Sequence, residues 1–206
     1  MRSRLNGLVV ETRVEDIAAA TAEAIVNPAN TALVMGGGVA GALAVAAGPT
    51  VQEAALKLAP IALGEAVSTP AGNLRSRVVV HAATMPMLGR ATSQVVALAT
   101  RHALLAAGND RCKSIAFPAM GAGFGGVSIV DSAKVMFEEL VRHAGARQIP
   151  TEVMIYLRQD ALLAFDDRFV WWLKRLACTC GGAIHERKHT YNCPAERVAG
   201  PSFPVA

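Results

Sequence analysis

The apolar positions along the chain alternate between short extended runs and longer runs with helical spacing. Strands are predicted for residues 8–10, 24–26, 65–69, 77–83, 114–118 and 152–157. Helices are predicted for residues 39–47, 50–58, 92–107, 129–143 and 160–176. Because helices separate most of these strands, the pattern predicts a layered α/β fold with a mostly parallel central sheet.

Glycine, proline and capping residues mark the predicted boundary between the first two helices. Gly48 and Pro49 end the helix over 39–47. Thr50 is predicted to be the N-cap of the next helix, since Glu53 three residues later completes a capping box. The sequence therefore predicts two consecutive helices at this point.

The length and the periodicity fit one domain followed by an extension. A chain of 206 residues can bury one large core. From residue 177 onward the periodicity is lost, and glycine and proline exclude a long helix or strand. We therefore expect one domain over residues 1–176 and an irregular C-terminal extension, containing cysteine and histidine, over residues 177–206.

Charge and hydrophobicity restrict the partners and the compartment. The formal net charge is +4, but the basic residues are dispersed rather than gathered in one stripe, so nucleic acid is not an expected partner. No run of eighteen residues is free of glycine, proline and charge, so no membrane span is expected. Glu11 comes too early for a secretory signal. We expect a cytoplasmic protein.

Two glycine-rich loops each link a predicted strand to a helix. The first glycine loop, residues 36–39, lies in Met-Gly-Gly-Gly-Val-Ala-Gly and opens a helix. The second glycine loop, residues 121–126, reads Gly-Ala-Gly-Phe-Gly-Gly and follows the strand over 114–118. Backbone without Cβ atoms can approach an anion closely, and a helix N-terminus adds partial positive charge. Two such loops could hold one diphosphate, although each alone also fits a tight strand-to-helix corner.

Four separate motifs resemble the macrodomain family. In chain order they are N-P-A-N-x-x-x-x-x-G-G-G-V-A-G-A, G-E-A-V-x-T-P-A-G-N-L, V-V-V-H-A-A and I-A-F-P-A-x-G-A-G-F-G-G. The resemblance extends from about Val9 to Leu176. It implies a three-layer α/β/α fold, in which helices flank a mixed, mostly parallel central sheet of about six strands. It also implies ADP-ribose as the ligand with no required cofactor, and free ADP-ribose or an ADP-ribosylated macromolecule as the partner.

The resemblance also assigns roles to individual residues. Asp16 matches the acid that accepts the adenine amino group, Ile17 and Tyr156 match residues against the ring, and Asn30 matches the asparagine at the distal ribose. The loops around this ribose and the diphosphate match Gly36, Gly37, Gly38, Val39, Gly121, Ala122, Gly123, Phe124 and Gly125. Other interpretations stay open: Asp16 also fits a helix N-cap, Asn30 a turn residue, and both Phe124 and Tyr156 ordinary core packing.

Hydrolytic members of the family raise the question of catalysis. One group carries an aspartate just after the glycine run to position a water, and here that position is Ala40, which cannot act as a base. Others rely on the asparagine and a water held by the diphosphate, which makes Asn30 the candidate catalytic residue. These relatives often have a histidine and an aromatic residue where this chain has Met35 and Gly125. Binding is therefore the favoured function. The alternative is a hydrolase that removes ADP-ribose from acidic residues or deacetylates O-acetyl-ADP-ribose.

Three remaining features are weighed in the same way. The extension offers a candidate zinc site, because four of five cysteine and histidine residues could ligate the metal; the alternative is an extension that binds no metal. The five residues are Cys178, Cys180, His185, His189 and Cys193. Within the domain, His81 and Cys112 are predicted to be structural. A nicotinamide dehydrogenase is disfavoured, because the second glycine loop comes late and no second βαβ half follows it.

Overall fold

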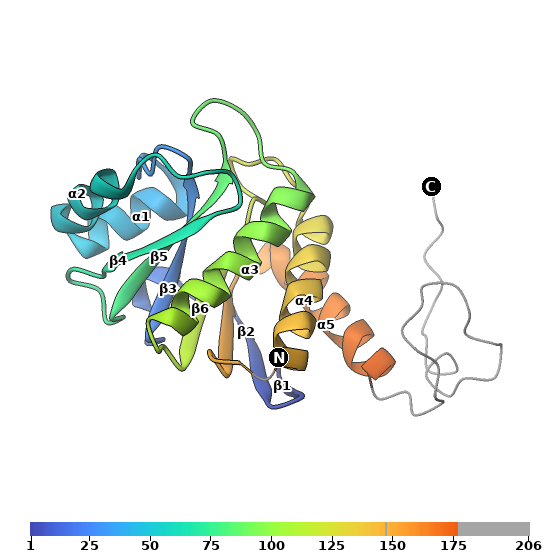
Figure 1. Cartoon of the computed structure of the whole chain (residues 1–206). Coiled ribbons are helices and arrows are strands. Elements are labelled where there is room, and N and C mark those ends of the chain that lie inside the picture. Colours follow the sequence, from blue (N-terminus) through green and yellow to red (C-terminus); the bar gives the residue numbers. More distant parts are fainter. Residues whose placement is uncertain (147, 177–206) are drawn as a thin grey trace.

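A computed structural model describes residues 1–146 and 148–176 (Figure 1). Its strands are β1 (Arg2–Leu5), β2 (Leu8–Arg13), β3 (Ala24–Asn30), β4 (Ala66–Pro70), β5 (Val78–Met85), β6 (Ser114–Pro118) and β7 (Glu152–Tyr156). Its helices are α1 (Gly38–Ala47), α2 (Pro49–Leu58), α3 (Ser93–Asn109), α4 (Ile129–Ala146) and α5 (Leu162–Leu176), with short 3-10 turns η1 (Ile17–Ala19) and η2 (Gln159–Ala161). The predicted α/β class is confirmed.

The seven strands of the described residues form one mixed sheet, in the order β1-β2-β7-β6-β3-β5-β4. The five central strands, β2, β7, β6, β3 and β5, run parallel to one another. The two edge strands, β1 and β4, pair antiparallel with β2 and β5. A mostly parallel mixed sheet was the prediction from the sequence, and it is confirmed with one strand more than expected.

Helices cover both faces of the sheet, because successive residues of a strand point to opposite faces. On β6, Ile115 and Phe117 belong to the large core that includes residues of α3, α4 and α5, whereas Ala116 belongs to the core beneath α1 and α2. Figure 1 shows these two helical layers on either side of the sheet. The core beneath α1 is rich in alanine, including Ala40 and Ala47, which lets this helix lie close to the strands.

The carboxyl ends of the five parallel strands meet at one edge of the sheet, which is where open α/β sheets bind their ligands. The segments that follow β3 and β6 at this edge carry the two glycine loops, and η1 follows β2. Because β7 ends at Tyr156, this edge brings together most of the predicted site residues.

Two details correct the sequence predictions. The first strand was expected at 8–10, yet β1 precedes it through a hairpin turn at Asn6 and Gly7, whose φ angles of 47° and 96° are those an Asn-Gly hairpin turn requires. The predicted capping by Thr50 is wrong: α2 begins at Pro49 after Gly48, and no side chain caps it. Proline has no amide hydrogen and a preset φ, so it suits the first helical position without a hydroxyl cap.

Among the described residues, no helix is both long and apolar enough to cross a membrane. The candidate zinc ligands lie outside the described part of the chain, so the irregular extension and its metal site stay predictions: Cys178, Cys180, His185, His189 and Cys193.

Candidate functional site

Asn30, at the end of β3, uses its side chain to fold the segment that leads to the first glycine loop. Its Oδ1 accepts hydrogen bonds from the amides of Ala32, at 3.0 Å, and Val34, at 3.3 Å. Its Nδ2 donates to the carbonyl of Val34 at 2.9 Å. The predicted alternative of a turn residue is therefore confirmed. One N–H of the carboxamide is left for a ligand, and the ribose contact of Asn30 stays a prediction.

Two residues that the sequence analysis missed, Gln52 and Leu33, fix the same segment to the body of the protein. Gln52, on α2, accepts from the amide of Met35 at 2.6 Å and donates to the carbonyl of Leu33 at 3.0 Å. Leu33 has a φ of 55° and is fully buried against Ala29 and Ala55. The path of the backbone into the glycine triplet is thus set by side chains on both sides of it.

The first glycine loop begins α1 with its amides unpaired. Gly37 is the N-cap, in an extended conformation, and no side chain caps the helix. The first bond of the helix runs from the amide of Gly41 to the carbonyl of Gly37, at 3.0 Å. The amides of Gly38, Val39 and Ala40 therefore have no partner within the helix, and they carry the positive end of its dipole. This arrangement is suited to an anion.

The second glycine loop is tightly packed against the rest of the chain. A Cβ at Gly121, where φ is 74°, would come within 2.6 Å of Val96. One at Gly125 would come within 2.6 Å of the carbonyl oxygen of Gly121. Gly126 has a φ of 77°, and its amide bonds the carbonyl of Gly123 at 3.1 Å. At positions 121, 125 and 126, the fold of the loop itself requires glycine.

Gly36 and Gly123 differ from these glycines. A Cβ at either position would meet no atom within 4 Å, and neither has a left-handed φ. Both are exposed. Nothing within the described residues therefore requires glycine at positions 36 and 123. Because no side chain covers the backbone at these two positions, a molecule from solvent can approach the main chain there closely.

Phe124 joins the two glycine loops. Its ring atoms lie 3.1 Å from the point where a Cβ would stand at Gly38, and 3.7 Å from the same point at Gly37. The side chain is 79% exposed, so the alternative interpretation of Phe124 as ordinary core packing is wrong. The ring instead forms an apolar contact between the loops at the surface.

The helix after the second glycine loop has a different N-terminus from that of α1. The Ser128 hydroxyl accepts from the amide of Asp131 at 3.0 Å and donates to the Asp131 carboxylate at 2.7 Å. This first turn of α4 is thus closed by its own side chains, and it carries a negative charge. Of the two helices, α1 supplies the open amides for an anion.

Asp16, Ile17 and Tyr156 gather where the neighbouring strands β2 and β7 end. Ile17 and Tyr156 belong to one buried cluster, and Tyr156 is 4% exposed. Asp16 is exposed and accepts from the amide of Ala18 at 2.9 Å, which confirms it as the N-cap of η1. An open surface pocket of about 340 Å³ is lined by Asp16 and Arg75, among others, but not by Ile17 or Tyr156. The adenine contacts of these residues stay predictions.

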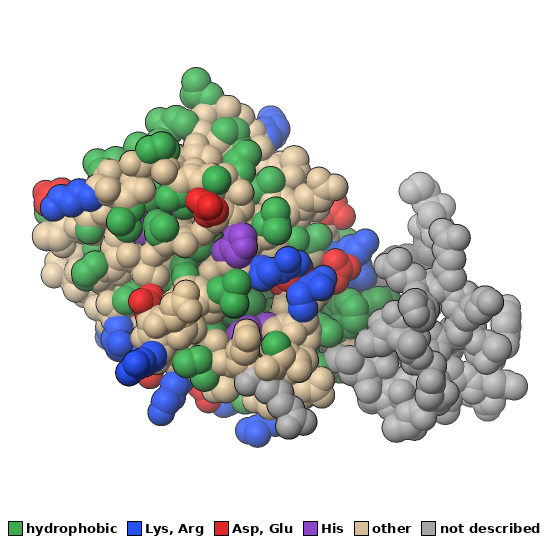
Figure 2. Space-filling view, viewed as in Figure 1, with side chains coloured by type: hydrophobic (Ala, Val, Ile, Leu, Met, Phe, Trp, Pro, Cys, Tyr) green, Lys and Arg blue, Asp and Glu red, His purple; other side chains and the backbone are tan. Residues whose placement is uncertain are grey.

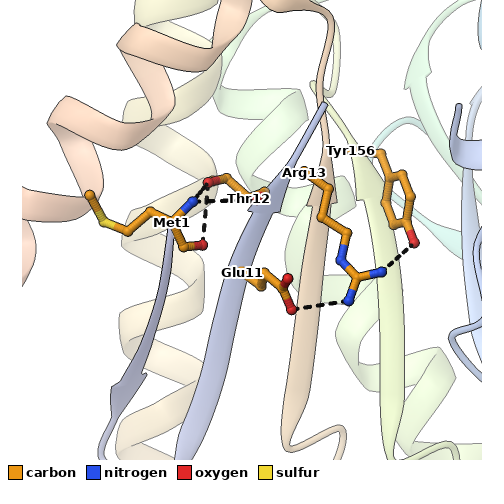
Figure 3. A network of polar contacts seen from close by, with 5 residues as sticks. All are labelled: Met1, Glu11, Thr12, Arg13 and Tyr156. Carbon is orange, nitrogen blue, oxygen red and sulfur yellow. Dashed lines mark hydrogen bonds and ion pairs between the residues drawn. The ribbon is translucent and has the colours of Figure 1, made fainter. Parts of the chain in front are cut away.

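Tyr156 is held in place by Arg13, which the sequence analysis did not single out (Figure 3). Nη1 of Arg13 donates to the Tyr156 hydroxyl at 3.5 Å, and the guanidinium carbon lies 5.9 Å from the ring centroid. Nη2 donates to the Glu11 carboxylate at 3.1 Å, and this hydrogen bond raises the pKa of Arg13. Arg13 and Tyr156 are paired in the β2–β7 register. Arg13 therefore contacts both the hydroxyl and the ring of Tyr156.

His81 and Cys112 are structural, as predicted. The His81 ring is fully buried, with Nδ1 3.1 Å from Nδ2 of Asn27 and Nε2 2.9 Å from the hydroxyl of Thr69. Burial lowers the pKa of His81 to about 4. Cys112 is also fully buried, and burial raises the pKa of its thiol. Neither side chain is available to a ligand at neutral pH.

The two glycine loops and the segments beside them carry few polar side chains. Residues 30–41 and 119–128 contain no aspartate, glutamate or histidine. Ala40, where one group of hydrolases has its aspartate, is 8% exposed and packs in the core beneath α1. Within the described part of the chain, no three histidine, cysteine or acidic side chains are placed to hold a metal ion. These two segments therefore offer backbone amides to an anion, but no carboxylate or imidazole that could act as a general base.

Sequence comparison relates the chain to proteins of bacteria and archaea. The family model for the Macro domain matches residues 26–136, more than half of the chain. A protein of Aeropyrum pernix is 42% identical over 131 residues, which cover 63% of this chain and 69% of that protein. A protein of Mycobacterium tuberculosis is 41% identical over 134 residues, 65% of this chain. The match covers 37% of the mycobacterial protein, so this relative is much longer than the shared part.

Solved structures share the fold over most of this chain. The Oceanobacillus iheyensis macrodomain with ADP superposes with a TM-score of 0.78 at 25% identity, covering 85% of this chain and 97% of that chain. The Trypanosoma brucei macrodomain in complex with ADP-ribose gives a TM-score of 0.68 at 22% identity, covering 77% of this chain and 68% of that chain. This second likeness is one of fold alone.

Proposed function

The chain belongs to the macro domain family, and on that basis we propose that it binds ADP-ribose, free or as a mono-ADP-ribosyl group on a macromolecule. The observation that carries the proposal is the pair of exposed glycines, Gly36 and Gly123. Their positions require no glycine for the fold, yet they lie on two loops held together by Phe124. Each opens a path to the backbone, which a diphosphate needs if it is to accept hydrogen bonds from main-chain amides.

The proposed ligand runs along the carboxyl edge of the sheet. The adenine lies at the ends of β2 and β7, with Asp16 accepting from its amino group and Ile17 and Tyr156 against the ring. The diphosphate lies between the glycine loops, where the open N-terminus of α1 favours negative charge. The distal ribose lies beside Asn30. The Oceanobacillus structure with ADP supports this class of ligand, because that protein matches nearly the whole described fold.

Calorimetric titration with ADP-ribose tests the proposal. We expect a dissociation constant in the micromolar range or below, roughly −8 kcal/mol of binding free energy. Gly123→Val is expected to abolish binding sterically without affecting folding, because the new side chain points into open space. Gly145→Val is the matched control: position 145 is equally free of neighbours but lies in α4, away from the loops. A normal isotherm for Gly123→Val would remove the second glycine loop from the site.

Binding without rapid hydrolysis is the function that we propose. The site contains no acid or histidine in its loops, and three polar contacts of the Asn30 side chain are already made within its own segment. Incubation with a protein that carries ADP-ribose on a carboxylate should leave the linkage intact over many minutes. Rapid release that disappears in Asn30→Ala would instead establish the hydrolase alternative.

A further inference from the structure

The loop over residues 86–92, between β5 and α3, has an apolar tip that the proposed function does not use. Leu88 is 90% exposed and Met87 is 51% exposed. The loop projects beyond the carboxyl edge of the sheet at the top of Figure 1, and hydrophobic side chains gather at the top of the face in Figure 2. Covering an exposed leucine and a neighbouring methionine with a partner removes apolar surface from water, which stabilises the complex.

This loop is fastened to the second glycine loop. The amide of Ala91 donates to the carbonyl of Gly125 at 2.9 Å. A Cβ at Gly125 would come within 2.9 Å of the Ala91 side chain, and the Arg90 guanidinium lies against Gly126. The absence of a side chain at position 125, where hydrolytic relatives often have an aromatic residue, therefore lets Ala91 pack there, and the absence of one at position 126 makes room for Arg90.

The other end of the loop begins beside the distal end of the proposed ligand. Met85, the last residue of β5, is paired with Asn30, and its carbonyl accepts from the amide of Thr31 at 3.1 Å. In the strand order, β5 lies on the opposite side of β6 from β2 and β7, where the adenine is placed. The loop thus leaves the sheet at the ribose end and reaches the second glycine loop. It therefore borders the distal-ribose end of the proposed site, where the modified macromolecule is joined to ADP-ribose.

The charge of this rim is small and positive. Residues 30–41, 86–92 and 119–128 contain a single charged side chain, that of Arg90. Arg90 is exposed and forms no ion pair within the described residues. An apolar tip with one unpaired guanidinium complements a surface that presents apolar and acidic groups together. A polypeptide can supply both, whereas a nucleic acid would be held by several basic side chains.

From this geometry we infer that residues 86–92 recognise the polypeptide to which ADP-ribose is attached. Met87 and Leu88 contact apolar side chains next to the modified residue, and Arg90 contacts a neighbouring carboxylate. The inference rests on the proposed function and adds a partner to the same site: ADP-ribose supplies the common part of the affinity, and the loop selects the attached chain. The natural ligand is accordingly a modified protein rather than free ADP-ribose.

The test compares the affinities of one protein for two ligands. The probes are free ADP-ribose and a peptide that carries one ADP-ribosyl group between leucine and glutamate residues. We expect the wild-type chain to bind the peptide about tenfold more tightly than free ADP-ribose, as burial of one leucine side chain can provide. Leu88→Ser and Arg90→Ala should each reduce this ratio severalfold. Leu105→Ser is the matched control, since Leu105 is also exposed but lies about 20 Å further along α3.

The outcomes separate the two proposals. If the wild-type chain binds neither probe, the proposed function fails. If it binds both probes equally, the function stands and the role of the loop is refuted. The same holds if Leu88→Ser and Arg90→Ala have the same ratio of peptide affinity to ADP-ribose affinity as Leu105→Ser. A third probe, ADP-ribose attached to the end of an oligonucleotide, should bind no more tightly than free ADP-ribose. Preferential binding of this probe would also refute the inference.

Discussion

Burial of His81 predicts that the stability of the domain depends on pH. The ring is fully buried between Asn27 and Thr69, and its pKa falls from 6.5 to about 4 on folding. The unfolded chain therefore binds a proton between pH 6.5 and pH 4 that the folded chain does not. Stability from this group is fully present above pH 6.5 and falls as the pH is lowered through that window.

The magnitude follows from the difference between the two pKa values. Each pKa unit corresponds to about 1.4 kcal/mol, so the full loss below pH 4 is roughly 3 kcal/mol. Between pH 7.5 and pH 5.0, the free energy of unfolding should fall by about 2 kcal/mol through His81 alone. That is a large share of the stability of about 5–15 kcal/mol that is typical of a domain.

Urea denaturation of the wild type and of His81→Gln at both pH values measures this contribution. Glutamine does not titrate, so the variant should be less stable at pH 7.5 but should lose about 2 kcal/mol less than the wild type on acidification. His102→Gln is the matched control, because it removes a half-buried histidine of α3 and leaves the network of Asn27 and Thr69 intact. Equal pH dependence in the wild type and His81→Gln would refute the reasoning.

Two further predictions concern the ligand site. Asp16→Ala should weaken ADP-ribose binding at least tenfold in calorimetry. Asp16→Asn is the control, because it keeps an oxygen for the cap of η1 and so separates the loss of charge from the loss of the cap. If both variants bind ADP-ribose as tightly as the wild type, Asp16 does not contact the adenine. Gln52→Leu removes both hydrogen bonds to the segment before the first glycine loop, so ADP-ribose affinity should fall severalfold while α2 remains folded. Hydrogen exchange at the amide of Met35 should become faster. An unaltered exchange rate would mean that the segment holds its shape without Gln52.

The order of strands and helices could be predicted from the sequence because each element has its own local signal. The apolar runs of β3, β5 and β6 and the spacing of α3 and α4 require no knowledge of their neighbours. The hairpin of β1 also has a local signal, the turn pair Asn6-Gly7, but residues 2–5 contain two arginines and a single apolar residue and so lack the apolar pattern of a strand. The capping prediction for Thr50 failed because two local signals competed there, and proline at the first helical position prevailed.

The parts of the site that could not be predicted depend on distant contacts. Gln52 lies 17 residues from the amide that it accepts from, and no pattern in α2 distinguishes it from a solvent-exposed glutamine. Arg13 and Tyr156 meet only because β2 and β7 are neighbours in the sheet. The sequence likewise contains two runs of glycine but does not reveal which glycines the fold requires. Only the three-dimensional packing separates Gly36 and Gly123 from Gly121, Gly125 and Gly126.

The exposed ring of Phe124 has a consequence for the rate at which a ligand enters. The edge of this ring lies against the first glycine loop. The backbone of both loops is anchored by hydrogen bonds, through Gln52 before the first loop and through Ala91 at the second. We therefore expect ligand entry to require at most rotation of this surface side chain, which takes picoseconds to nanoseconds, and no slow opening of a lid. We expect ADP-ribose to associate without a conformational delay, and variants of the cleft to differ mainly in how long the bound ligand stays.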